Sequence, residues 1–225
     1  MADRFRYRIT FAKTEAMRFT GHLDMYRTWE RTLRRAGLGL AYSEGFNPRP
    51  KMHLAAALPL GSLSQNDLLD VWLEQAETPE EVRRRLEAAA PPGIRIQDVQ
   101  AVPGDEPALP QQIAASVYEV SSHEFPPPAE LSARVARLLA QDHLPRLRRG
   151  KAYDLRPLIE ALSYDEERRL LRMQLAAREG ATGRPEEVLA ALGLEGASAT
   201  MVRTGLRKHA LPRAAGARIP LSDTG

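Results

Sequence analysis

The chain has 225 residues, of which 43% are hydrophobic, enough for one large core or for two cores of about 100 residues each. It contains no cysteine, which excludes disulfides, thiolate metal ligands and a cysteine nucleophile, and no apolar run long enough to span a membrane. The net charge is only +3, but residues 1–51 hold eleven Lys or Arg against five Asp or Glu. A basic N-terminal region suits phosphate or an acidic partner, whereas the excess of Arg over Lys, 28 to 4, also fits ordinary solvated surface.

Six elements are predicted in the first half, in the order strand, helix, strand, strand, helix, strand. Alternating apolar and polar residues predict strands over residues 6–13, 68–74 and 94–102. Helical spacing predicts a helix over residues 22–36. The second helix is predicted to begin at Pro79, because Thr78 is a favourable N-cap and Glu81 completes a capping box.

The chain then repeats itself at an offset of 106 residues, since PEEV occurs at 79–82 and again at 185–188. Sliding the chain by this offset brings each predicted element onto a segment of the same type. Each half therefore has a βαββαβ order, which is the ferredoxin-like arrangement. We predict an α+β protein of two tandem ferredoxin-like domains from an internal duplication, over residues 1–102 and 112–209. A linker rich in Pro, Gly and Asp would join them, and residues 210–225 are expected to form a disordered tail.

The first helix is predicted to have two distinct faces. Its apolar stripe would consist of Leu23, Tyr26, Trp29 or Glu30, Leu33 and Ala36, with Gly37 as the C-cap. Another face carries four arginines at spacings of three and four residues, namely Arg27, Arg31, Arg34 and Arg35. Asp24 lies one turn before Arg27, where it could orient the guanidinium groups or form an ordinary surface ion pair.

His22 is the residue of this helix best suited to catalysis, because imidazole titrates near neutral pH. A role as general acid or base requires a substrate hydroxyl within hydrogen-bonding reach. The alternative is a histidine that caps the start of the helix. We predict no metal site, since His22 and Asp24 alone cannot hold a metal ion.

The helix leads into YSEGFNPRPK, residues 42–51, which we expect to form a stiff loop. Gly45 permits a positive φ, and the two prolines fix an extended course. The loop would present Asn47, Arg49 and Lys51, with Phe46 free to stack, as suits a nucleic-acid backbone and an unstacked base. The alternative is a hairpin or crossover loop with Phe46 in the core. The second half lacks both this loop and the arginine row, so the function is expected in the first half.

The motif HLDxxRxxERxLRRAGLxLAYSEGFNPRPK, followed by ALPLGSxS and DLLDVWLE, resembles the bacterial radical SAM-linked protein family. This is a domain of unknown function, found alone or at the C-terminus of radical SAM proteins. The resemblance is dense over residues 7–74 and collinear to about residue 209. It covers His22, Asp24, Arg31, Arg35, Ser43, Gly45, Phe46, Asn47, Pro48 and Pro50. Members often lie near genes for ribonuclease G and ribosomal proteins, which implies an RNA-linked role.

A chain without cysteine cannot hold a conventional iron–sulfur cluster, so the resemblance implies that the radical SAM enzyme is a separate partner. We expect a cytoplasmic, non-catalytic RNA-binding accessory module without a cofactor. The anion- and RNA-binding residues would be Arg27, Arg31, Arg34, Arg35, Ser43, Phe46, Asn47, Arg49 and Lys51, supported by Asp24, Glu44, Gly45 and Pro48. One alternative is a metal-independent enzyme that processes or modifies RNA with His22. Another is a protein-interaction module for the radical SAM partner.

Overall fold

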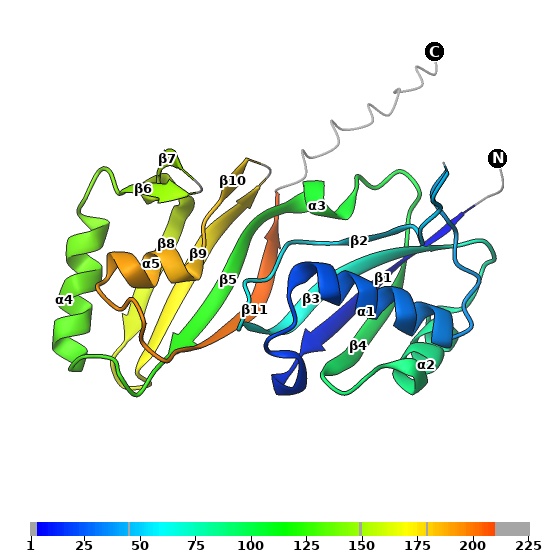
Figure 1. The fold of residues 1–225 in the computed structure, drawn as a ribbon, viewed down its shortest axis with the longest axis horizontal. Coiled ribbons are helices and arrows are strands. Elements are labelled where there is room, and N and C mark those ends of the chain that lie inside the picture. Colours follow the sequence, from blue (N-terminus) through cyan, green and yellow to red (C-terminus); the bar gives the residue numbers. More distant parts are fainter. Residues whose placement is uncertain (1–3, 45, 149, 179, 210–225) are drawn as a thin grey trace, which may run out of the picture.

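The structure, a computed structural model, describes residues 4–44, 46–148, 150–178 and 180–209. These residues form a mixed α/β fold built on one large, mostly antiparallel sheet of nine strands (Figure 1). The strand order is β10-β9-β5-β11-β3-β1-β4, with β2 beside β3 and β8 beside β9. The predicted tail, residues 210–225, and Gly45 lie outside the described residues.

The first half contains the six elements that the sequence predicts, in the predicted order. They are β1 (Phe5–Lys13), α1 (His22–Arg35), β2 (Met52–Leu54), β3 (Leu63–Leu73), α2 (Pro79–Ala89) and β4 (Ile94–Val102). A short 3-10 turn, η1 (Glu15–Met17), precedes α1. The Thr78 side chain accepts a hydrogen bond from the Glu81 amide at 3.2 Å, which confirms the predicted cap of α2.

A short helix, α3 (Leu109–Gln112), leads into the second half. Its elements are β5 (Ile113–Ser121), α4 (Pro128–Leu139), β6 (Pro145–Arg148), β7 (Lys151–Asp154), η2 (Arg156–Leu158), β8 (Ile159–Asp165), β9 (Leu170–Arg178), β10 (Ala181–Thr182), α5 (Pro185–Ala191) and β11 (Thr200–Lys208). Strands β6 and β7 form a separate two-stranded hairpin between α4 and β8.

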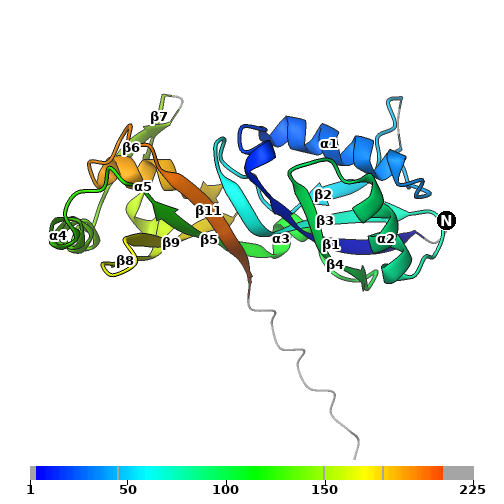
Figure 2. The same cartoon turned by 90° about the horizontal axis from the view of Figure 1, so that it is seen from below.

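Corresponding strands lie in the same order in the two halves. The order is β4-β1-β3-β2 in the first and β11-β5-β9-β8 in the second, with antiparallel pairing throughout each set. Helices α1 and α4, helices α2 and α5, and strands β4 and β11 begin 106 residues apart. Each half has its own hydrophobic core, in which its two main helices pack on its strands. Figure 2 shows α1 lying along one face of the sheet.

The buried face of α1 matches the prediction at Trp29, Leu33 and Ala36 but differs from it in the first turn. Met25, Trp29 and Leu33 are buried at spacings of four, and the Trp29 ring meets Phe11 edge-on at 4.8 Å. Leu23, which the predicted stripe included, is 73% exposed. The correction arises because α1 carries apolar residues on two faces, and contact with β1 selects the face that contains Met25.

The two halves share one sheet, because β11 pairs in parallel with the beginning of β3. Arg203 of β11 is only 1% exposed, and its guanidinium donates to both carboxylate oxygens of Asp67 on β3 at 2.7 Å. The same side chain donates to the carbonyl of Ala57 at 2.9 Å. A bidentate buried ion pair therefore joins the halves beside the short parallel pairing of β11 with β3.

The connection predicted as a linker is folded back onto the sheet. Arg6 donates to the buried carboxylate of Asp70 and to the carbonyls of Glu106 and Pro107 at 2.7 and 2.8 Å. Arg8 binds the same Asp70 carboxylate. The connection is thus fixed to β1 and β3 on the sheet face opposite α1.

Candidate functional site

The segment between α1 and β2, residues 41–51, forms a narrow hairpin that projects from the fold. The Ser43 amide donates to the Arg49 carbonyl at 2.8 Å, and the Lys51 amide donates to the Ala41 carbonyl at 2.7 Å. The Ser43 hydroxyl accepts from the Arg49 amide at 3.1 Å. Ser43 therefore holds the two sides of this segment together, and the neighbouring Glu44 is exposed.

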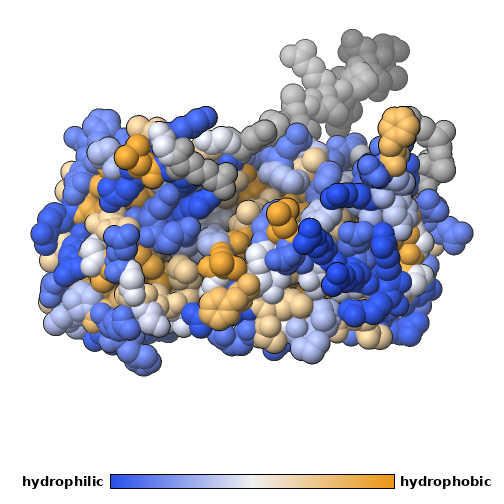
Figure 3. All heavy atoms as spheres, viewed as in Figure 1, coloured by the Kyte–Doolittle hydropathy of each residue, from blue (hydrophilic) through white to orange (hydrophobic). Residues whose placement is uncertain are grey.

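Phe46 lies near the tip of this hairpin and is fully exposed. Of the two predicted arrangements, the structure has the hairpin but does not place Phe46 in the core. In Figure 3, hydrophobic surface projects at the upper right, beside mostly hydrophilic surface. An aromatic ring in this position is available for stacking on a partner.

A groove of about 670 Å³ separates this hairpin from α1. It is lined by Leu23, Tyr26, Arg27, Glu30, Asn47, Pro48 and Arg49. The Tyr26 hydroxyl donates to the Met52 carbonyl at 3.2 Å, which fixes the ring against β2. The structure therefore brings two of the predicted cations, Arg27 and Arg49, to one groove together with Asn47 and an aromatic ring.

The remaining arginines of α1 do not line this groove. Arg34 pairs with Glu30 at 2.8 Å, and Arg35 donates to the Ala89 carbonyl at the end of α2. Arg31 is exposed on the outer face of the helix. The predicted row is thus divided between the groove, the solvent and the contact with α2.

Asp24 and Arg27 interact as the sequence predicts, at 3.3 Å and with both side chains largely exposed. An exposed pair of this kind contributes about 0–1 kcal/mol to stability. The guanidinium of Arg27 can therefore leave Asp24 for a phosphate oxygen at little cost.

Lys51 lies on the opposite side of the sheet from α1. Its ammonium group is 4.7 Å from the centre of the Trp72 ring, which Arg6 also approaches at 5.1 Å. The next residue, Met52, is buried in the core beneath α1, and successive side chains of a strand point to opposite faces. Lys51 is therefore not brought together with Arg27 and Arg49.

His22 is not among the residues that line the groove; it is an exposed residue that also lines a narrow cavity together with Lys13, Thr20 and Asp67. Burial lowers the pKa of His22, and the nearby charge of Arg203 lowers it further. No carboxylate among the described residues raises this pKa. The imidazole is therefore mainly neutral at pH 7.

Lys13 is a buried cation near His22 that the sequence did not single out. It is almost fully buried, and its ammonium group donates to the carbonyls of Arg18, Thr20 and Ser62 at 3.0 to 3.1 Å. Burial lowers its pKa, but all three of its N–H groups are engaged. Lys13 therefore fixes the entry to α1 and is not free to act as a nucleophile. The only hint of this role in the sequence is that Lys13 places a cation at the end of an apolar strand.

We expect the imidazole of His22 to titrate below its usual pKa of about 6.5. Because the folded chain binds this proton less readily than the unfolded chain, His22 reduces stability as the pH falls from about 6.5 through the folded-state pKa. Titration of the imidazole signals by NMR, assigned with His22→Gln, measures the midpoint. A midpoint above 6.5 would reveal an acidic partner and restore His22 as a candidate acid or base.

The described residues contain no group of three or more His, Asp or Glu side chains arranged to hold a metal ion. Across the same residues, no helix has the length and hydrophobicity needed to cross a membrane.

Residues 6–185 match the family described as "Uncharacterized protein conserved in bacteria (DUF2344)". No curated protein matches the chain. The matched region includes α1, the 41–51 hairpin and both walls of the groove.

Proposed function

The chain belongs to the DUF2344 family of uncharacterized bacterial proteins, and we propose that it is a non-catalytic module that binds single-stranded RNA in the groove beside α1. The observation that carries this proposal is the convergence of Arg27 and Arg49 on one groove, next to Asn47 and the exposed Phe46. Two guanidinium groups can hold successive phosphates, and exposed aromatic rings can stack on unpaired bases.

The groove offers different chemistry for the backbone and for the bases of RNA. Arg27 and Arg49 would supply the sequence-independent phosphate contacts. The Asn47 amide has a donor and an acceptor for a base edge, and Phe46 offers an aromatic face. His22 does not line this groove, which favours binding without catalysis.

The RNA would be presented to a radical SAM enzyme that is a separate polypeptide in the cytoplasm. This part of the proposal is supported by the resemblance of residues 7–74 to radical SAM-linked proteins and by the absence of cysteine from the sequence.

We also propose that the two halves are ferredoxin-like domains that arose by duplication. The shared strand order, the separate cores and the offset of 106 residues support this origin. Because the second half lacks the groove residues, duplication would have left one copy free to act as scaffold.

Crosslinking of RNA to the protein in its own cells tests the proposed function. The native chain is expected to carry a defined set of RNAs, and Arg27→Glu/Arg49→Glu is expected to lose it. The matched control is Arg137→Glu/Arg168→Glu, which changes the net charge equally at exposed positions of the second half.

Absence of crosslinked RNA from the native chain would overturn the proposal. Equal loss in both variants would also overturn the assignment to the groove, because net charge alone would then explain binding. If Arg27→Glu/Arg49→Glu still retains the RNA, and the native chain alters that RNA chemically, an enzyme is favoured over a binding module.

A further inference from the structure

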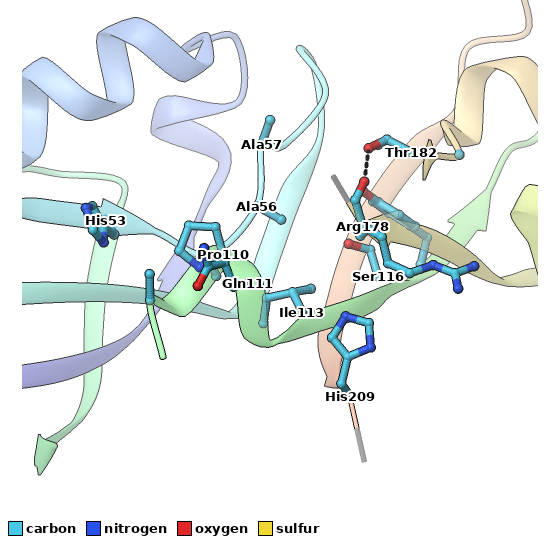
Figure 4. Close-up of a pocket in the computed structure, with 15 residues that line it drawn as sticks. His53, Ala56, Ala57, Pro110, Gln111, Ile113, Ser116, Arg178, Thr182 and His209 are labelled. Atoms are coloured by element: carbon cyan, nitrogen blue, oxygen red, sulfur yellow. Dashed lines mark hydrogen bonds between the residues drawn. The ribbon is translucent and has the colours of Figure 1, made fainter. Parts of the chain in front are cut away.

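A second cavity, called the cleft below, has a volume of about 760 Å³ and lies between the two halves (Figure 4). The connection from β2 to β3 and helix α3 form one wall, with Ala56, Ala57 and Gln111. The opposite wall comes from the end of β9 and from β10, with Thr182. This volume is in the range of small-molecule sites, which often lie between structural units.

The lining combines small apolar side chains with separate hydrogen-bonding groups. The alanines leave open space beside the walls, whereas Gln111 and Thr182 are exposed and bear neutral donors and acceptors. Figure 4 shows His53 at the left, Thr182 and Arg178 at the right, and His209 below them. The Nδ1 atom of His53 is buried and has no hydrogen-bond partner among the described residues. The cleft can therefore accept a flat group that has polar edges.

Positive charge lies at the rim of this cleft. Arg178 lines it and its side chain is about half exposed, with the guanidinium drawn turned away from Ala56 and Gln111 in Figure 4. Its only ion pair among the described residues, with Glu160, is long at 3.6 Å. A change of rotamer in this long, half-exposed side chain would bring its guanidinium to an anionic group on a ligand in the cleft.

Two projections flank the cleft along the upper edge in Figure 1. One is the 41–51 hairpin, and the other is the β6–β7 hairpin, which occupies the corresponding place in the second half. Both also lie on the side of α1 in Figure 2. In the β6–β7 hairpin Lys151 and Leu147 are exposed, whereas Arg148 is held by Glu187.

We propose that this cleft binds a nucleoside monophosphate unit, with its base against Ala56 and Ala57, its polar edges at Gln111 and Thr182, and its phosphate at Arg178. The choice of ligand rests on the proposed RNA-binding function. The unit could be one nucleotide of a bound strand or a free nucleotide, and the chemistry recognised is the same.

Calorimetric titration with AMP, CMP, GMP and UMP tests the cleft directly. At least one nucleotide is expected to bind the native chain, and Ala57→Trp, which fills the cleft from an exposed position, is expected to weaken it about tenfold or more. Gln111→Ala is the second variant, and it is expected to alter the preference among the four bases. Arg137→Glu/Arg168→Glu, which lies outside both the cleft and the groove, should bind the mononucleotide as the native chain does.

A single-stranded oligonucleotide separates this inference from the proposed function. If the native chain binds no mononucleotide, and Ala57→Trp binds the oligonucleotide with native affinity, the cleft proposal is wrong although the groove stands. If mononucleotides bind the cleft while no oligonucleotide binds, the cleft stands with a free nucleotide as its ligand and the groove proposal fails. Equal mononucleotide affinity in the native chain and Ala57→Trp would also overturn the cleft assignment.

Discussion

Arg203→Met is expected to lower the free energy of unfolding by about 3–5 kcal/mol, the range for breaking a buried ion pair on one side. Arg203 is 1% exposed and binds both carboxylate oxygens of Asp67, which is itself 6% exposed. Methionine fills much of the space but leaves the carboxylate buried without its partner. The substitution also removes the hydrogen bond to the Ala57 carbonyl.

Urea unfolding of the native chain and of Arg203→Met measures this loss. The matched control is Arg172→Met, because Arg172 also pairs across strands, with Glu119 at 3.1 Å, but both side chains are partly exposed. That control is expected to lose only about 0–1 kcal/mol through its ion pair. The double variant Arg203→Met/Asp67→Asn should recover part of the loss, since it leaves no unpaired charge. Equal losses for Arg203→Met and Arg172→Met would contradict a buried ion pair between the halves.

The elements of the first half follow from the sequence because local chemistry determines their ends. Thr78, Pro79 and Glu81 mark the start of α2 with groups that bind the first turn of the helix. Gly37 follows α1 with a φ of +65°, a conformation that glycine adopts without strain. These signals act over a few residues and require no knowledge of distant contacts.

The buried charges could not be predicted in the same way. Arg203 and Asp67 are separated by 136 positions, and Arg6 reaches Pro107 across 101. Nothing in the sequence near either residue identifies its partner. Likewise, the choice between the faces of Leu23 and Met25 depends on the contact with β1, which belongs to the tertiary structure.

The candidate site was predicted in part. The sequence predicts a stiff loop over residues 42–51 beside the arginine face of the first helix, and the structure places Arg27, Asn47 and Arg49 of these two segments at one groove. The position of Lys51 does not follow from the sequence. Which face of the sheet each side chain of a strand points to depends on the register of strand pairing. A shift of one residue would have placed Lys51 on the side of α1.

Arg27→Glu/Arg49→Glu is expected to weaken the affinity for single-stranded RNA by about a hundredfold or more at low salt. Two phosphate contacts are lost, and two carboxylates then repel the backbone. Phe46→Ala should weaken binding by about 1–3 kcal/mol through lost stacking, with little change in salt dependence. Fluorescence anisotropy with a labelled oligonucleotide measures both effects.

Arg137→Glu/Arg168→Glu is the control for net charge in this experiment. Both of its sites lie in the second half, on α4 and in the turn between β8 and β9, away from the groove. It is expected to retain most of the native affinity. A loss equal to that of the groove variant would mean that binding depends on total charge and not on this site.

The salt dependence of RNA binding tests the central claim most directly. A plot of the logarithm of the association constant against the logarithm of salt concentration should be linear, with a slope of about −0.7 for each phosphate contact to a single strand. The proposal predicts that Arg27→Glu/Arg49→Glu reduces the magnitude of this slope by about 1.4, while Arg137→Glu/Arg168→Glu leaves it unchanged. A native slope near zero, or the same slope in the native chain and in the groove variant, would contradict phosphate binding by Arg27 and Arg49.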